Sequence, residues 1–119
     1  MFFVGRLSAQ QLVFCESVDA SGRPSGASNT FSITRQGSFL NILVTLKKPA
    51  GAGKVIYDIY HVEDGREVFE SSSPKNVQPE WWWFNKGFTF YKPGDYAVYV
   101  YGEDEKLIAS GKLKLVLKR

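Results

Sequence analysis

Hydrophobic and polar residues alternate with a period of two along several short stretches of this chain. Between positions 38 and 47, Leu40, Ile42, Val44 and Leu46 fall on one side. Similar or shorter extended stretches are predicted at 11–18, 30–34, 54–62, 66–70, 81–84, 88–90, 95–101 and 106–118. No stretch of useful length shows helical periodicity. The pattern therefore predicts an all-β protein of about seven or eight strands.

The segments between these stretches are rich in residues that favour turns. Residues 19–29 and 71–79 are predicted to be polar loops, and residues 49–53 a turn. Asp64-Gly65 predicts a tight hairpin, because both residues tolerate the left-handed backbone conformation that such turns require. A β-bulge is predicted at Gly87.

Polarity within each strand predicts which face is buried. Asp58 is a poor core residue, so its neighbours Tyr57 and Ile59 should point inward, while Ile56 and Tyr60 point outward. The same reasoning gives a predicted core of Leu40, Ile42, Val44, Val55, Tyr57, Ile59, Tyr96, Val98, Val100, Leu113 and Leu115. If strands 54–62, 95–101 and 106–118 are neighbours, one outer face, here called the tyrosine face, carries Ile56, Tyr60, Tyr99, Tyr101, Lys112 and Lys114.

Residues 88–101 carry the most specific signal in the chain. Phe90 and the turn Pro93-Gly94 are followed by Tyr96 and the alternating Val98 and Val100. Residues 55–117 resemble immunoglobulin-like or fibronectin type III-like sandwich domains, in which a corner tyrosine bonds back to upstream backbone where the chain changes sheets. The resemblance implies an antiparallel β-sandwich, taken here as one domain over residues 1–119, with Tyr96 as its corner tyrosine. It implies no catalytic activity.

Composition agrees with a folded domain and narrows the function classes. Of the 119 residues, 44% are hydrophobic and 23% charged, which argues against disorder. Cys15 is the single cysteine, so an intramolecular disulfide is excluded. Residues 1–4 are too short for the core of a signal peptide, and no run approaches the ~18 apolar residues of a membrane span. The sequence indicates no compartment.

The tyrosine face is the leading candidate for a binding surface. Tyrosine is enriched at interfaces because it brings a large contact area and a polar tip. Another protein, or a second copy of this one, is the expected partner, and the alternative is that tyrosine simply suits strands. Lys112 and Lys114 among the tyrosines would suit single-stranded nucleic acid. The small net charge of +3 and Asp58 on the same face argue against that partner.

Trp81, Trp82 and Trp83, followed by Phe84, form the second candidate site. In a strand, Trp81 and Trp83 would share one face, and Trp82 and Phe84 the other. One pair should lie in the core. The other pair is either covered by a loop or exposed as a platform for stacking on sugar rings, since exposed apolar patches mark interaction sites.

No residue pattern supports an enzyme, a cofactor or a metal site. His61, placed on an outward or edge position, and Cys15 stand alone where transition-metal sites recruit several such ligands. Glu103-Asp104-Glu105 is an acidic turn without the convergent oxygens that Ca²⁺ needs. Residues 51–54 lack the glycine and hydroxyl spacing of a phosphate-binding loop. The sequence therefore predicts a non-catalytic interaction module, such as an accessory domain of a larger bacterial or surface assembly, with carbohydrate binding as the alternative.

Overall fold

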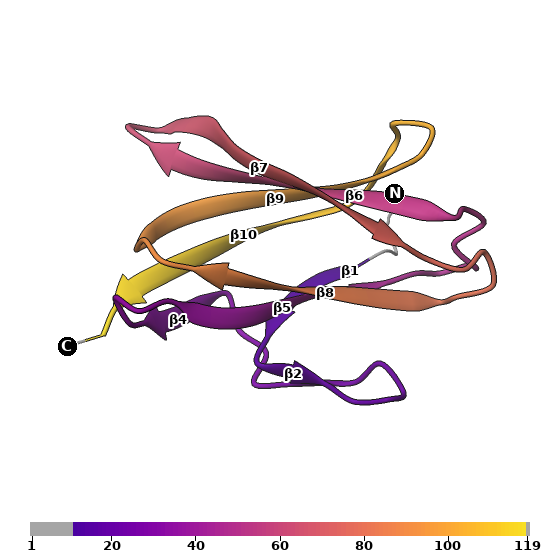
Figure 1. The fold of residues 1–119 in the computed structure, drawn as a ribbon, viewed down its shortest axis with the longest axis horizontal. Coiled ribbons are helices and arrows are strands. Elements are labelled where there is room, and N and C mark those ends of the chain that lie inside the picture. Colours follow the sequence, from indigo (N-terminus) through magenta and orange to yellow (C-terminus); the bar gives the residue numbers. More distant parts are fainter. Residues whose placement is uncertain (1–10, 119) are drawn as a thin grey trace, which may run out of the picture.

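A computed structural model describes residues 11–118, and this range folds into β-strands without a helix (Figure 1). The strands are β1 (Gln11–Cys15), β2 (Ser17–Val18), β3 (Pro24–Ser25), β4 (Thr30–Ile33), β5 (Ser38–Thr45), β6 (Lys54–Glu63), β7 (Arg66–Asn76), β8 (Trp83–Phe90), β9 (Gly94–Gly102) and β10 (Leu107–Leu117). The all-β prediction is confirmed.

Across 11–118 no helix is long and apolar enough to cross a membrane. The signal-peptide argument concerns residues 1–4, outside the described residues.

Two sheets face each other in a sandwich (Figure 1). The three-stranded sheet has the order β1-β5-β8, and the five-stranded sheet has the order β4-β10-β9-β6-β7. All pairings in both sheets are antiparallel except that of β4 with β10, which is parallel. Strands β10, β9 and β6 are consecutive neighbours, which is the arrangement assumed for the tyrosine face. β7 and β8 each end their sheet and border the same open side of the sandwich.

The core lies between the two sheets and contains every residue predicted for it. Tyr57 of β6 is fully buried and donates a hydrogen bond from its hydroxyl to the carbonyl of Ile42 in the opposite sheet, at 3.0 Å. Its ring also packs on Phe84 and Phe88 of β8. Burial raises the pKa of Tyr57, because the phenolate would lose its hydration. This side chain therefore links the two sheets.

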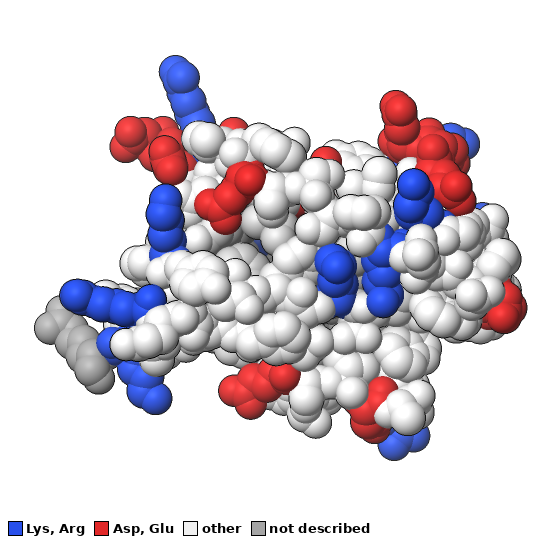
Figure 2. Space-filling view, in the orientation of Figure 1, with Lys and Arg blue, Asp and Glu red and all other residues white. Residues whose placement is uncertain are grey.

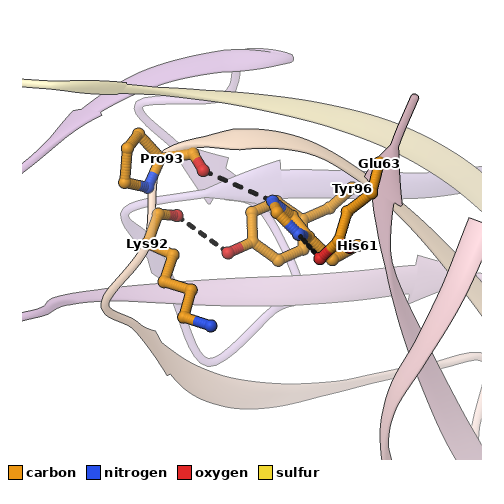
Figure 3. Close-up of polar contacts among 5 residues, drawn as sticks. All are labelled: His61, Glu63, Lys92, Pro93 and Tyr96. Carbon is orange, nitrogen blue, oxygen red and sulfur yellow. Dashed lines mark hydrogen bonds and ion pairs between the residues drawn. The ribbon is translucent and has the colours of Figure 1, made fainter. Parts of the chain in front are cut away.

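Tyr96 occupies the predicted corner where the chain passes from β8 to β9 (Figure 3). Its hydroxyl donates to the carbonyl of Lys92 at 2.8 Å, and its buried ring packs edge-on against Phe90. The ring also contacts His61, whose Nε2 lies 3.4 Å from the carbonyl oxygen of Pro93. The contacts of the ring and the hydroxyl confirm Tyr96 as the corner tyrosine.

Two segments predicted to be loops contain strands. Residues 71–76 continue β7, which pairs with β6 through Lys54↔Asn76. Their serines and Pro74 obscured the strand, but β7 is an edge strand, where proline and polar residues are tolerated. Within 19–29, β3 pairs with β2 to form a hairpin. Both segments were misread because an exposed strand need not show alternating hydrophobicity.

The predicted bulge at Gly87 is wrong. β5 and β8 pair without interruption from Ser38↔Phe90 to Thr45↔Trp83. A Cβ atom at position 87 would lie 2.0 Å from the ring of Phe39, which crosses over Gly87 from β5, so any larger residue would have to displace this ring. Register shifts occur instead between Ile59 and Tyr60 and near the start of β10.

The hairpin β2–β3 lies against the outer face of the three-stranded sheet (Figure 1). Cys15 and Leu43 project from this outer face, yet they are 0% and 1% exposed. Gly22, in the hairpin connection, lies so close to Trp83 that a Cβ atom would come within 2.7 Å of the indole. The hairpin thus covers an apolar sheet face that would otherwise be exposed to water.

Candidate functional site

The three tryptophans have different environments. Trp83 begins β8 opposite Thr45 and packs on Gly22 of the hairpin, whereas Phe84, on the other face, lies in the core. Trp81 and Trp82 precede the strand and are 38% and 52% exposed. The prediction that all four residues form one strand with alternating faces is therefore wrong for Trp81 and Trp82. They follow Pro79 in a turn that is closed by the Trp81 amide donating to the Gln78 carbonyl.

The backbone of the exposed tryptophans is held in place by the connection between β5 and β6. The amide of Leu46 donates to the Trp82 carbonyl at 2.9 Å, and the amide of Ala50 donates to the Trp81 carbonyl at 2.8 Å. A third bond runs from Gly51 to the carbonyl of Pro79. These bonds fix the backbone that carries the two exposed indoles, so a ligand need not order this segment on binding.

A pocket of about 340 Å³ lies beside the tryptophans. Its lining, here called the tryptophan pocket, consists of Lys75, Trp81, Trp82, Trp83, Phe84 and Asn85. Asn85 donates from Nδ2 to Oδ1 of Asn41 at 2.8 Å, and no hydrogen bond reaches its own Oδ1 from any residue between 11 and 118. The pocket therefore combines aromatic surface with two polar lining residues, Lys75 and Asn85.

Lys75 and Asn85 were not predicted as site residues. Lys75 lay in a segment interpreted as a loop, and Asn85 carried no motif. The structure brings Lys75 to the tryptophans because the long edge strand β7 ends beside the start of β8, which no local pattern in the sequence indicates.

The tyrosine face exists as an arrangement of neighbouring strands, but its tyrosines are half-buried. Tyr60 packs edge-on against Tyr99 on one side and against Phe69 of β7 on the other, at 5.5 Å and 5.6 Å between ring centroids. Phe69 is 56% exposed and enlarges the aromatic area beyond the predicted residues. The face is thus a cluster of rings that contact one another.

Polar atoms of the tyrosine face are also partly paired within the domain. The hydroxyl of Tyr99 donates to the carboxylate of Glu67, with oxygen distances of 2.7 Å and 2.8 Å. This bond to the carboxylate, together with some desolvation, raises the pKa of Tyr99 to about 12. Lys114 lies 4.0 Å from Asp95. Ile56 and Tyr101 border a hollow of about 540 Å³ at the end of the face.

The alternation that places Tyr99 and Tyr101 on the tyrosine face predicts that Ala97 also faces solvent. It does project from the outer face, but it is 2% exposed. Tyr60 and Lys112 lie opposite it on the two neighbouring strands, and their larger side chains shield it.

The remaining candidate groups do not converge on a site. His61 was expected on an outward or edge position, yet it pairs with Tyr96 on the inner side of β6 and contacts Glu63 at 3.0 Å. Alternation along β6 explains the inward position of His61, since its neighbours Tyr60 and Val62 face outward. Glu103 of the acidic turn accepts a bond from the Gly53 amide at 2.8 Å. Among residues 11–118, no three His, Cys, Asp or Glu side chains are grouped to hold a metal ion.

Comparison with known proteins identifies the fold. No family model and no curated protein matches the sequence. Among solved structures, the chain is similar to the crystal structure of a Niemann-Pick type C2 protein from Japanese carpenter ant, with a TM-score of 0.53 and 13% identity over 93% of this chain and 94% of that one. The fold is an immunoglobulin-like β-sandwich. At this identity the similarity extends to the fold alone.

Proposed function

We propose that this domain is a non-catalytic binding module that recognises carbohydrate at the tryptophan pocket. The observation that carries the proposal is the pair of exposed indoles, Trp81 and Trp82, at a pocket whose polar lining includes Lys75 and Asn85. Sugar rings present flat C–H faces that stack on aromatic planes, and their hydroxyls pair with amide and ammonium groups. Binding pockets usually combine apolar walls with a few placed polar groups in this way.

The comparison of exposed area favours this pocket over the tyrosine face. Tyr60, Tyr99 and Tyr101 are half-buried, and the Tyr99 hydroxyl is already bonded to Glu67. Trp82, in contrast, is 52% exposed, so about half of its surface is available to a ligand.

Tryptophan fluorescence tests the proposal directly. A panel of soluble neutral and acidic oligosaccharides is titrated into the domain, and at least one class should shift or quench the emission. Trp82→Ala should abolish the response while the circular dichroism spectrum is unchanged. Tyr91→Ala is the matched control, because Tyr91 is an exposed aromatic residue outside the pocket. If no saccharide in the panel binds, the proposal is wrong.

A second candidate function is protein binding or self-association through the tyrosine face. The observation that favours it is Phe69, which is largely exposed and continues the row of rings formed by Tyr60 and Tyr99. Buried aromatic anchors commonly contribute about 2 kcal/mol or more at an interface. Sedimentation velocity over a range of concentrations should then show association that a Tyr99→Ala, Tyr101→Ala double variant loses. A monomer at all concentrations excludes self-association.

A further inference from the structure

Two lysines occupy positions on the inner faces of the sheets, where hydrophobic residues are expected. Lys75 of β7 lies opposite Val55, and Lys86 of β8 lies opposite Ile42. Val55 and Ile42 both face the core. Because β7 and β8 are the edge strands of their sheets, the two lysine side chains leave the core side at the open border of the sandwich.

The positive charge at this border is not matched within the domain. Neither lysine forms an ion pair with any residue from 11 to 118. The Lys86 ammonium lies 5.8 Å from the centre of the Phe88 ring. Figure 2 shows basic side chains together in the middle of this face, where β7 and β8 lie in Figure 1, with no acidic side chain between them.

The two charges also act on each other. Burial lowers the pKa of Lys75, and the charge of Lys86 lowers it further. Both effects disfavour the charged ammonium when no anion is present. An anion placed between the lysines would reverse them, because it supplies the opposite charge and accepts charge-assisted hydrogen bonds.

Lys75 belongs to the lining of the tryptophan pocket, so the unmatched charge borders the stacking surface. We propose that the ligand is a saccharide that carries an anionic group, a carboxylate or a sulfate. Its sugar ring lies on Trp82, and its anion lies at Lys75 and Lys86. This inference rests on the proposed carbohydrate function and names the class of sugar.

The experiment compares saccharides that differ only in charge. Oligosaccharides of galacturonic, glucuronic and mannuronic acid are paired with their methyl esters, and a sulfated galactan oligosaccharide with its desulfated form. Affinity is measured by calorimetry and tryptophan fluorescence at low and high salt. We expect at least one acidic form to bind roughly tenfold more tightly than its neutral partner, equivalent to about 1.4 kcal/mol, and the difference to shrink at high salt.

Lysine variants test whether Lys75 and Lys86 cause the difference in affinity between acidic and neutral saccharides. In the Lys75→Gln, Lys86→Gln double variant the acidic saccharide should bind no better than the neutral one. The Lys112→Gln variant, changed on the tyrosine face, should retain the full preference for the acidic saccharide. Thermal melts verify that each variant is folded. Trp82→Ala should remove binding of both forms.

The outcomes separate the two proposals. If acidic and neutral forms bind equally and Trp82→Ala abolishes both, the carbohydrate function stands and the acidic preference is wrong. If no form binds, both proposals are wrong. If sodium sulfate or sodium acetate, which have no sugar ring, displaces the acidic oligosaccharide completely at equal concentration, the site takes small anions rather than an acidic saccharide, and the inference is overturned.

Discussion

The tyrosine face and the tryptophan pocket are both rich in aromatic side chains, but their partners differ. On the tyrosine face, Tyr60 contacts Tyr99 and Phe69, and Tyr99 bonds Glu67. At the pocket, hydrogen bonds hold the backbone of Trp81 and Trp82 while their rings remain exposed. Side chains that already contact and hydrogen-bond one another contribute less binding free energy to a ligand than exposed rings on a fixed backbone.

The difference arises from the position of each cluster in the sandwich. Tyrosines in the middle of a sheet have neighbours on both adjacent strands, at the close distances of cross-strand pairs. Trp81 and Trp82 lie in a turn before an edge strand, where side-chain neighbours are fewer. A cluster's composition therefore does not by itself reveal a binding site.

Trp83→Ala should destabilise the domain by about 2–3 kcal/mol, somewhat below the loss expected for a fully buried aromatic residue. The reason is that Trp83 fills the contact between β8 and the hairpin at Gly22. Trp82→Ala, measured alongside by urea denaturation, should change the unfolding free energy by no more than about 0.5 kcal/mol, because its ring is exposed. Equal losses in both variants would contradict the division between a structural and an exposed tryptophan.

Tyr96→Phe should lower the unfolding free energy by about 1–2 kcal/mol, since the Lys92 carbonyl loses its donor at a partly buried corner. Tyr91→Phe serves as the control, because Tyr91 is largely exposed, and it should have no measurable effect. A change within error of zero for Tyr96→Phe would mean that water replaces the corner bond without loss.

High pH should weaken the domain through tyrosines whose pKa is raised by folding. Burial raises the pKa of Tyr96 to about 12, and the bond to Glu67 raises that of Tyr99 to about 12. The unfolded chain ionises near pH 10, so the stability contributed by the neutral phenols is complete below pH 10 and is lost between about pH 10 and 12. Thermal melts across this range should show the decline.

The Glu67→Gln variant distinguishes the pKa shift of Tyr99 from that of Tyr96. In this variant the pKa of Tyr99 should fall toward the ordinary value, because the carboxylate that disfavours the phenolate is gone. The pKa of Tyr96 should be unchanged. Absorbance titration of tyrosinate, combined with a Tyr99→Phe variant for assignment, provides the measurement, and an unaltered Tyr99 titration would show that the bond to Glu67 does not form in solution.

The reactivity of Cys15 tests whether the hairpin β2–β3 covers the three-stranded sheet. Burial raises the pKa of its thiol, so the native protein should react with a thiol reagent far more slowly than the unfolded chain. Rapid reaction of the native protein would mean that the hairpin opens readily.

Much of the fold was predictable from local residue patterns. The alternation at Leu40, Ile42 and Val44 predicted a strand with one buried face, because a period of two leaves a single choice once one face is apolar. Tyr96 was predictable because the turn before it and the strand after it form one continuous segment. Asp64 and Gly65 do adopt the left-handed conformation that their hairpin turn requires, with φ of 54° and 77°.

The exposed strands and the site were decided by tertiary structure. β7 carries serines and a proline because it needs to pair on one side only, so its strand character depends on β6 rather than on its own sequence. Trp81, Trp82 and Trp83 are adjacent in the sequence, yet their exposure depends on a turn, an edge strand and a distant glycine. Lys75 and Lys86 lie on opposite sheets, and the closing of the sandwich places them at the same border. Alternation determines on which face of its strand a side chain lies, whereas its neighbours across the fold determine whether water, protein or a ligand covers it.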